Sequence, residues 1–229
     1  ETIEEDLARR DLTINAMALA LDDGELRLVD PYGGQADLSA KAIRAVGNPE
    51  RRFEEDALRM LRAVRLSAEL GFGIEEKTAS AIRGRAHSLR AIAKERIRDE
   101  LSRLLMAGGD GEGARRDLST PPNFGKFTDT PSIAPESRRL AGEDVGASQA
   151  WIALERLAEL NLLAETIPEL AEGVACTQNK HHVFTVWEHN ARALDYAARQ
   201  AWGLAVRWGA LLHDVAKPRA KVGEGPDST

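Results

Sequence analysis

The segment RRFEEDALRMLRAVRL, at residues 51–66, constrains the fold of this chain more than any other feature. Its apolar residues recur at the three- and four-residue spacing of an α-helix, which predicts a helix over residues 53–70 that Gly71 ends. One narrow face of this helix holds the residues expected to be buried: Ala57, Met60, Leu61, Val64 and Ala68. The arginines lie outside that face, and Asp56 lies one turn before Arg59 on the same predicted helix.

The charged side of this helix has two interpretations. An Asp56–Arg59 ion pair on a surface helix would contribute a few tenths of a kcal/mol to stability. Alternatively, the three basic residues Arg59, Arg62 and Arg65, with no lysine among them, suit the recognition of phosphates and base edges by planar donors. The neighbouring segments distinguish the two.

The composition limits the possible partners of the protein. The chain has 229 residues, 43% hydrophobic and 30% charged, as in an ordinary soluble globular protein. A net charge of −6 argues against indiscriminate coating of nucleic acid. The single cysteine, the lack of an export leader and the lack of a long apolar run predict a cytoplasmic protein without a membrane span. A local basic stretch nevertheless predicts RNA-facing side chains, namely Arg83, Arg85, Arg90, Lys94, Arg96 and Arg98.

The rest of the chain is predicted to be mainly helical. Two apolar runs, 19–21 and 26–29, flank the turn signal Asp22-Asp23-Gly24 and predict a hairpin, and residues 41–46 predict a further strand. Glycines and prolines at 108–148 predict a flexible linker or insert. Helical texture predicts helices at residues 13–20, 75–87, 91–106, 151–163, 183–199 and 203–216.

Four short motifs follow one another along the first half of the chain. They are RDLTINAMA at 10–18, DPYGG at 30–34 with Asp37-Leu38 behind it, EDALRMLRA at 55–63, and ERIRDEL at 95–101. This succession resembles the class II tRNA nucleotidyltransferases, which are the bacterial CCA-adding enzymes and their poly(A) polymerase relatives. The resemblance implies an enzyme that adds C and A to tRNA 3′ ends, with tRNA, CTP and ATP as its partners.

The resemblance assigns a base-selecting role to Asp56 and Arg59, which match the family's protein template for the incoming nucleotide. A carboxylate accepts from the exocyclic amine of cytosine or adenine, while a guanidinium donates to the ring acceptor beside it. Uracil and guanine would set a carbonyl oxygen against the carboxylate. An Asp–Arg pair one helical turn apart can therefore select C and A without a nucleic-acid template.

Further nucleotide contacts follow from the same resemblance. Arg62 and Arg65 would reach the triphosphate, and Arg10 and Asp11 match positions that contact the triphosphate and the ribose respectively. A helix N-cap is the alternative role for Asp11, and the two roles are compatible. The glycines at 33–34 match a flexible turn of the family or form an ordinary tight turn.

The resemblance also implies Mg²⁺ for nucleotidyl transfer, held by carboxylates of an upstream Gly-Gly-x-x-Arg-Asp and Asp-x-Asp stretch. The sequence contains no such stretch, so we expect the catalytic carboxylates to lie outside this chain. The chain begins at Glu1 in what looks like the middle of a domain and ends in a loop-like segment, 225–229. We therefore expect an interior fragment that is inactive for transfer by itself.

A second constellation lies near the end of the chain. His189, followed by His213-Asp214 at the end of an apolar segment, resembles the HD superfamily of metal-dependent phosphohydrolases. The resemblance implies a divalent metal, Mg²⁺, Mn²⁺ or Ni²⁺, that can activate water against a phosphoester. The alternatives are a core histidine for His189 and a helix-terminal polar pair for the other two.

The predicted fold class is α+β and mainly α-helical, with a small β remnant of a nucleotidyltransferase palm, a helical neck and body, and the start of an all-α HD domain. The predicted parts are a head at 1–47, a nucleotide-selecting and RNA-binding neck at 48–107, a linker at 108–148, a body segment at 149–178 and a partial HD domain at 179–229. The predicted function is tRNA 3′-end processing by CCA addition. The alternatives are an HD-type phosphohydrolase acting on nucleotide or RNA phosphates, and a non-catalytic RNA-binding protein.

Overall fold

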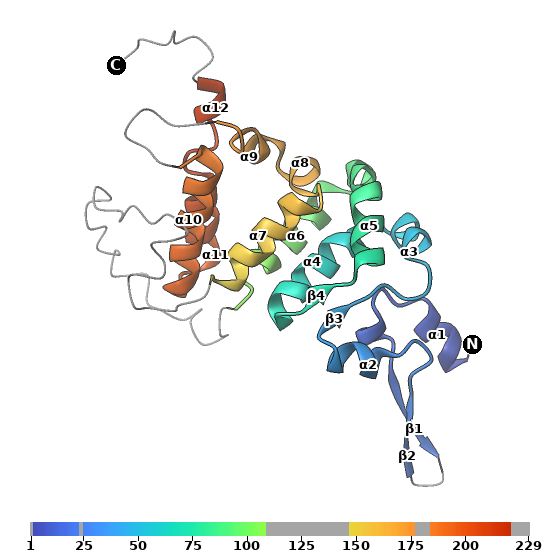
Figure 1. The fold of residues 1–229 in the computed structure, drawn as a ribbon. Helices are drawn as coiled ribbons and strands as arrows, with labels where there is room; N and C mark the ends of the chain where they lie inside the picture. Colours follow the sequence, from blue (N-terminus) through green and yellow to red (C-terminus); the bar gives the residue numbers. More distant parts are fainter. Residues whose placement is uncertain (1, 23–24, 109–146, 177–183, 221–229) are drawn as a thin grey trace.

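The computed structural model describes residues 2–22, 25–108, 147–176 and 184–220. These residues form a mainly helical α+β protein, as predicted, which extends from a projecting β-hairpin at one end to α10–α12 at the other (Figure 1). The predicted linker at 108–148 falls almost entirely outside the described residues. No helix within the described ranges is long and apolar enough to cross a membrane.

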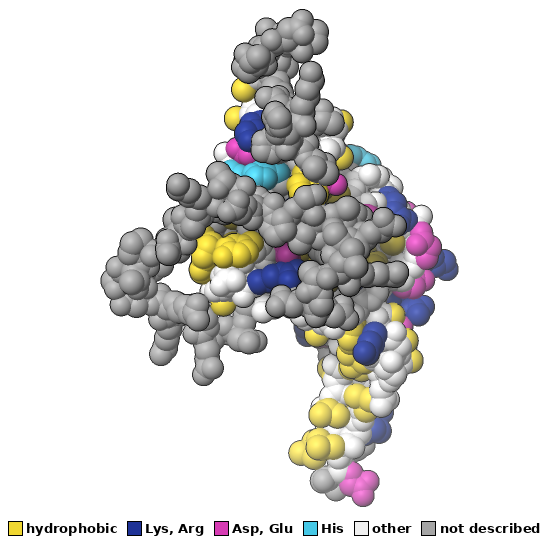
Figure 2. All heavy atoms as spheres, turned by 60° about the vertical axis from the view of Figure 1, so that its left-hand side comes forward, with side chains coloured by type: hydrophobic (Ala, Val, Ile, Leu, Met, Phe, Trp, Pro, Cys, Tyr) yellow, Lys and Arg dark blue, Asp and Glu magenta, His cyan; other side chains and the backbone are white. Residues whose placement is uncertain are grey.

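The N-terminal part contains the predicted hairpin. Helix α1 (Ile3–Ala8) leads to the 3₁₀ turn η1 (Thr13–Asn15), and strands β1 (Ala18–Asp22) and β2 (Glu25–Val29) then pair antiparallel. The prediction of a helix over 13–20 is therefore wrong. Alternate small residues of β1 face a small core, while its leucines face outward, so strand pairing overrides the local helical tendency. The leucines of the hairpin leave an exposed apolar tip, visible at the lower end of Figure 2.

A short helix and a short strand connect the hairpin to the helical part. After α2 (Gly34–Ser39), strand β3 (Ala42–Ile43) pairs in parallel with β4 (Gly73–Ile74), so the strand predicted at 41–46 is shorter than expected. This pairing brings the N-terminal part against the segment that follows α4.

The helix predicted over residues 53–70 is two helices, α3 (Pro49–Glu55) and α4 (Leu58–Leu70). The helical conformation is interrupted at Asp56, which has an extended backbone with φ −153° and ψ 105°. Its Oδ1 accepts a hydrogen bond from the Leu58 amide at 3.0 Å and so satisfies one of the free donors at the start of α4. The prediction of one continuous helix was wrong at this residue because a local side-chain-to-backbone bond competes with the helical one.

The predicted buried face of α4 is confirmed. All five of its apolar residues are at most 5% exposed, and Gly71 ends the helix in the left-handed conformation with φ 67°. Helices α5 (Glu76–Arg85) and α6 (Lys94–Leu105), joined by the 3₁₀ segment η2 (Ala86–Ala91), cover the same core.

The second half continues this core. Its helices are α7 (Gln149–Glu159), α8 (Leu163–Thr166), α9 (Pro168–Glu172), α10 (Val186–Arg199), α11 (Leu204–Leu212) and α12 (Lys217–Ala220). A single apolar cluster runs from α3 to α11. The predicted helices at 151–163, 183–199 and 203–216 are each confirmed with shifted ends.

A buried arginine fixes α11 to its neighbours. Arg207 is 1% exposed, and its guanidinium donates to the carbonyl oxygens of Leu105 at 2.7 Å, Trp202 at 2.8 Å and Ala198 at 3.4 Å. Burial lowers the pKa of Arg207. Leu105 and Ala198 lie in the last turns of α6 and α10, and Trp202 lies between α10 and α11, so one side chain joins three backbone segments.

Candidate nucleotide-binding site

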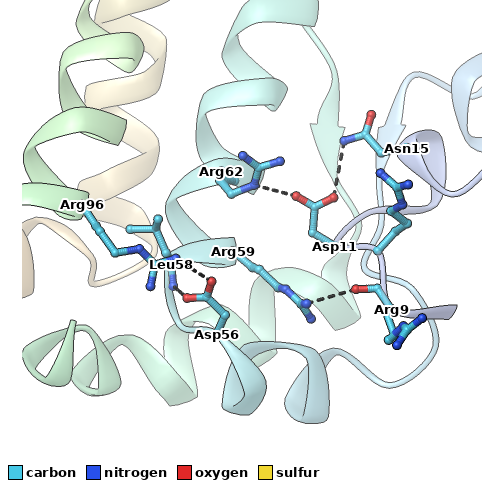
Figure 3. Close-up of a pocket in the computed structure, with 9 residues that line it drawn as sticks. Arg9, Asp11, Asn15, Asp56, Leu58, Arg59, Arg62 and Arg96 are labelled. Carbon is cyan, nitrogen blue, oxygen red and sulfur yellow. Dashed lines mark hydrogen bonds and ion pairs between the residues drawn. The ribbon is translucent and has the colours of Figure 1, made fainter. Parts of the chain in front are cut away.

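An open pocket of about 530 Å³ lies where the N-terminal part meets α4 and α6 (Figure 3). Its size is that of a small-molecule site. Five arginines and two aspartates dominate its lining, which consists of Arg9, Arg10, Asp11, Asn15, Asp56, Leu58, Arg59, Arg62 and Arg96. Five of the six residues predicted to bind a nucleotide are among them. Such a cationic pocket with two fixed carboxylates suits an anionic ligand that also offers hydrogen-bond donors.

Asp11 is the most enclosed acid of the pocket, with 8% exposure. Its Oδ2 accepts from Arg62 Nε at 2.7 Å, and its Oδ1 accepts from the Leu12 amide at 2.9 Å and from Asn15 Nδ2 at 3.4 Å. Burial raises the pKa of the Asp11 carboxyl, but the hydrogen bond and charge of Arg62 outweigh it and hold the pKa below its usual value. The alternative role of Asp11 as a helix N-cap is not realised, because no side chain caps η1.

Asp56 and Arg59 both line the pocket, and they do not form the ion pair of the alternative interpretation. Asp56 Oδ2 pairs with Arg96 Nη2 at 2.8 Å. Arg59 pairs with Glu55 at 2.8 Å and donates to the carbonyl oxygen of Arg9 at 3.0 Å. The break between α3 and α4 is the physical reason, because it removes Asp56 from the helix that carries Arg59. Figure 3 shows the two side chains on neighbouring parts of the pocket wall.

The structure separates the two arginines predicted to reach a triphosphate. Arg62 lines the pocket and contacts Asp11. Arg65 is absent from the described lining and instead pairs with Glu100 at 2.9 Å and Glu69 at 3.0 Å, with its side chain 13% exposed. The two arginines follow each other one turn apart along the same side of α4, and Arg65 lies beyond the pocket, against Glu100 of α6.

Glu100 is a residue that the sequence reasoning missed. It is 4% exposed and accepts from Arg65 at 2.9 Å and Arg103 at 3.3 Å, while Arg62 Nη1 lies 3.7 Å away. The available signal was its position on the apolar stripe of α6, one turn after Ile97, where a lone carboxylate needs a partner. Arg9 and Asn15 are further lining residues that the motifs did not single out.

Arg10 lines the pocket and is paired within its own segment. Its Nη2 lies 2.7 Å from Asp6 Oδ2, and the hydrogen bond to Asp6 raises the pKa of the Arg10 guanidinium. A ligand phosphate would therefore compete with Asp6 for this side chain.

The predicted RNA-facing stretch is largely neutralised by acids. Five of its arginines form ion pairs, namely Arg83–Glu76, Arg85–Glu50, Arg90–Glu165, Arg96–Asp56 and Arg98–Asp99. Arg96 turns into the pocket, whereas Arg90 makes a bidentate bond to α8. RNA binding by these residues and by Lys94 stays a prediction.

The second predicted constellation is brought together in space. His189 Nε2 lies 2.9 Å from His213 Nε2, and Asp214 Oδ2 lies 3.4 Å and 3.5 Å from these two nitrogens. It is the one group of three metal-ligating side chains found in the described part of the chain. Figure 2 shows histidine side chains at the molecular surface next to acidic and basic ones. Lys217 Nζ also contacts Asp214, at 2.6 Å.

The sequence is similar to those of known proteins. Residues 1–44 match the family described as "Poly A polymerase head domain", and residues 71–113 match "Probable RNA and SrmB- binding site of polymerase A". A CCA-adding enzyme of Ligilactobacillus salivarius is 48% identical over 119 residues, which is 52% of this chain and 29% of that protein. An A-adding tRNA nucleotidyltransferase of Deinococcus radiodurans is 37% identical over 224 residues, which is 95% of this chain and 41% of that protein. The chain thus spans less than half the length of either relative.

The fold is also that of a solved tRNA nucleotidyltransferase complexed with a primer tRNA and an incoming ATP analogue. The TM-score is 0.57 at 24% identity, over 93% of this chain and 49% of that one. Residues 1–44 and 71–113 are thus similar to two regions of poly(A) polymerases, and the chain as a whole is similar to parts of CCA-adding and A-adding tRNA nucleotidyltransferases.

Proposed function

We propose that the protein is a tRNA nucleotidyltransferase that adds C and A to tRNA 3′ ends from CTP and ATP. The observation that carries the proposal is the meeting of a carboxylate, Asp56, with the guanidinium groups of Arg59 and Arg62 in one open pocket. The names of the relatives and the tRNA-bound structural neighbour support the same substrates. We place this activity in the cytoplasm, as the single cysteine suggests.

Base selection rests on hydrogen-bond complementarity in the pocket. An Asp56 lone pair accepts from the exocyclic amine of cytosine or adenine, and Arg59 donates to the neighbouring ring acceptor. A guanidinium has five N–H donors. The contacts of Arg59 to Glu55, Arg9 and Arg52 use three of them, which leaves donors for a base.

The rest of the nucleotide is assigned to the other side of the pocket. Arg62 and Arg10 bind the triphosphate, and Asp11 accepts from the ribose. Arg65 supports this arrangement indirectly, because it shares Glu100 with Arg62 and does not line the pocket.

The proposal includes Mg²⁺ for nucleotidyl transfer, which would be held by the carboxylates expected outside this chain. The proposal assigns the two pocket carboxylates to the nucleotide, Asp11 to the ribose and Asp56 to the base, and each is bound to an arginine. The metal supplies Lewis-acid chemistry at the transferred phosphate. The residues of this chain supply nucleotide choice and orientation.

The predicted division into parts is retained within the proposal. The head at 1–47 and the neck at 48–107 form the nucleotide pocket, and a linker at 108–148 leads to the body at 149–178 and an HD part at 179–229. The two family matches, at 1–44 and 71–113, support the first two parts.

An addition assay tests this function. The protein, produced together with the upstream carboxylate-bearing region expected above, is incubated with Mg²⁺, a tRNA that lacks its 3′ CCA, and one labelled nucleoside triphosphate at a time. We expect incorporation of C and A and not of U or G. Salt-dependent tRNA binding without incorporation would instead favour the RNA-binding alternative.

A metal-dependent phosphohydrolase activity is the second candidate, favoured by the His189, His213 and Asp214 cluster. Ligands ~2.1 Å from one metal lie roughly 3.0 Å apart at octahedral angles and roughly 3.4 Å apart at tetrahedral angles, close to the spacings of this cluster. The donor set therefore fits Mn²⁺, Ni²⁺ or Mg²⁺, which would activate water against a nucleotide or RNA phosphate. Metal analysis and a phosphatase assay with and without His213→Ala test it. A protein without metal or hydrolysis would exclude this candidate.

A further inference from the structure

Arg96 occupies a place that its sequence context does not suggest. It belongs to the basic stretch of α6, yet its guanidinium lines the nucleotide pocket and bonds to Asp56 across 40 positions of sequence. The neighbouring Arg98 shows the contrast, because it points away and pairs with the adjacent Asp99 at 2.8 Å. Figure 3 shows Arg96 reaching from α6 towards Asp56.

The Asp56 carboxylate is held at both oxygens. Oδ1 accepts from the Leu58 amide at 3.0 Å, and Oδ2 accepts from Arg96 Nη2 at 2.8 Å. A carboxylate has about four lone-pair sites, so these two bonds fix its plane and leave acceptor capacity directed into the pocket. The backbone amide alone would restrain only one oxygen and would let the other rotate.

We infer that Arg96 is a positioning residue that sets base specificity by fixing the plane of the Asp56 carboxylate. The inference rests on the proposed function of Asp56 as the base-reading acceptor. A carboxylate with a fixed plane accepts an amine and repels a carbonyl oxygen at the same point. A rotating carboxylate discriminates less, because it can turn its charge away from the carbonyl oxygen of uracil or guanine.

This role differs from phosphate binding in what the loss of Arg96 changes. A phosphate ligand contributes equally to all four nucleotides, so its loss weakens each by the same factor. Loss of a positioning residue changes the ratio between nucleotides. The Arg96 side chain is 52% exposed, and so exposed an ion pair adds little to folding stability. The fold should therefore survive its removal.

Equilibrium binding of CTP, ATP, UTP and GTP to the wild type, Arg96→Ala and Arg96→Lys tests the inference. Arg98→Ala is the matched control, since it removes an exposed arginine from the same helix. In Arg96→Ala we expect the preference for CTP over UTP to fall by about tenfold. Arg96→Lys keeps one donor and should restore part of that preference. Arg98→Ala should keep the wild-type ratio, and all thermal midpoints should stay close to that of the wild type.

Two results would overturn the inference. An equal loss of affinity for all four nucleotides in Arg96→Ala makes Arg96 a phosphate ligand, and an unchanged ratio makes it irrelevant to selection. A wild type that binds all four nucleotides equally contradicts the proposed base reading itself. That failure is distinguishable because it appears before any substitution is made.

Discussion

Arg62 Nε donates to Asp11 Oδ2 at 2.7 Å and so joins α4 to the segment before η1, 51 positions away in sequence. This bond closes one side of the nucleotide pocket. It also places a positive and a negative group of the motifs within reach of the same ligand, which explains why the two motifs belong to one site.

The Asp11 bond predicts a pH dependence of stability. The pKa of Asp11 in the folded protein is lower than in the unfolded chain, where it is about 3.9. Ionised Asp11 therefore stabilises the fold above about pH 4, and this contribution is lost as the pH falls through the lower folded-state pKa. In Asp11→Asn the acid-induced fall of the thermal midpoint should be shallower, as a calorimetric pH series would show. If the thermal midpoint of Asp11→Asn falls with pH as steeply as that of the wild type, Asp11 does not contribute to the acid sensitivity of the fold.

Glu100 should matter more for stability than any exposed acid of α6. Its removal leaves Arg65, which is mostly buried, with Glu69 as its remaining acidic partner. Glu100→Ala should lower the free energy of unfolding by about 3 kcal/mol, as for a broken buried ion pair. Denaturant unfolding measures this, with the exposed Glu95→Ala on the same helix as control. Equal effects of the two substitutions would show that burial of Glu100 has no energetic role.

Gly34 provides a test of the turn at residues 33–34. A Cβ at Gly34 would lie 2.3 Å from the Thr13 carbonyl oxygen. The Gly34 amide donates to Asp30 Oδ1 at 2.7 Å, so this turn is closely packed. Gly34→Ala should cost about 1–3 kcal/mol of stability. Gly84→Ala, in open space on α5, should instead stabilise by up to about 1 kcal/mol. Thermal unfolding of the two variants measures both effects. An unchanged stability of Gly34→Ala would show that the turn can accommodate a Cβ.

The histidine cluster predicts stabilisation by a metal. At a concentration a hundredfold above its Kd, Mn²⁺ or Ni²⁺ should raise the free energy of unfolding of the wild type by about 2.7 kcal/mol. The thermal midpoint should rise accordingly. His213→Ala should abolish the shift, and the exposed His87→Ala should retain it. A shift that persists in His213→Ala would place the metal elsewhere.

Apolar periodicity and motifs predicted much of this structure. Buried residues such as Met60 and Val64 followed from helical spacing, and the hairpin followed from its turn signal. The break at Asp56 could not be predicted, because it depends on one bond from its side chain to the Leu58 amide. The strand at Ala18–Asp22 depends on its partner strand, which local propensity does not contain.

The sequence predicted several residues that line the pocket, but it did not predict the ion pairs between them. The motifs identified Asp11, Asp56, Arg59 and Arg62, all of which line the pocket. Which arginine meets which acid was unpredictable, since Arg96 lies 40 positions from Asp56 and reaches it only through the packing of α6 on α4. Ion-pair partners follow from tertiary packing, and spacing along one helix constrains them only when that helix is unbroken.

Nucleotide selection by Asp56 and Arg59 is the core of the proposed function. The most direct measurement is the binding of CTP, ATP, UTP and GTP to the wild type, Asp56→Ala and Arg59→Ala, with the exposed Asp99→Ala as control. The wild type and the control should prefer CTP and ATP by about tenfold or more, and this preference should disappear in Asp56→Ala and Arg59→Ala. An unchanged preference in both pocket variants would contradict the account.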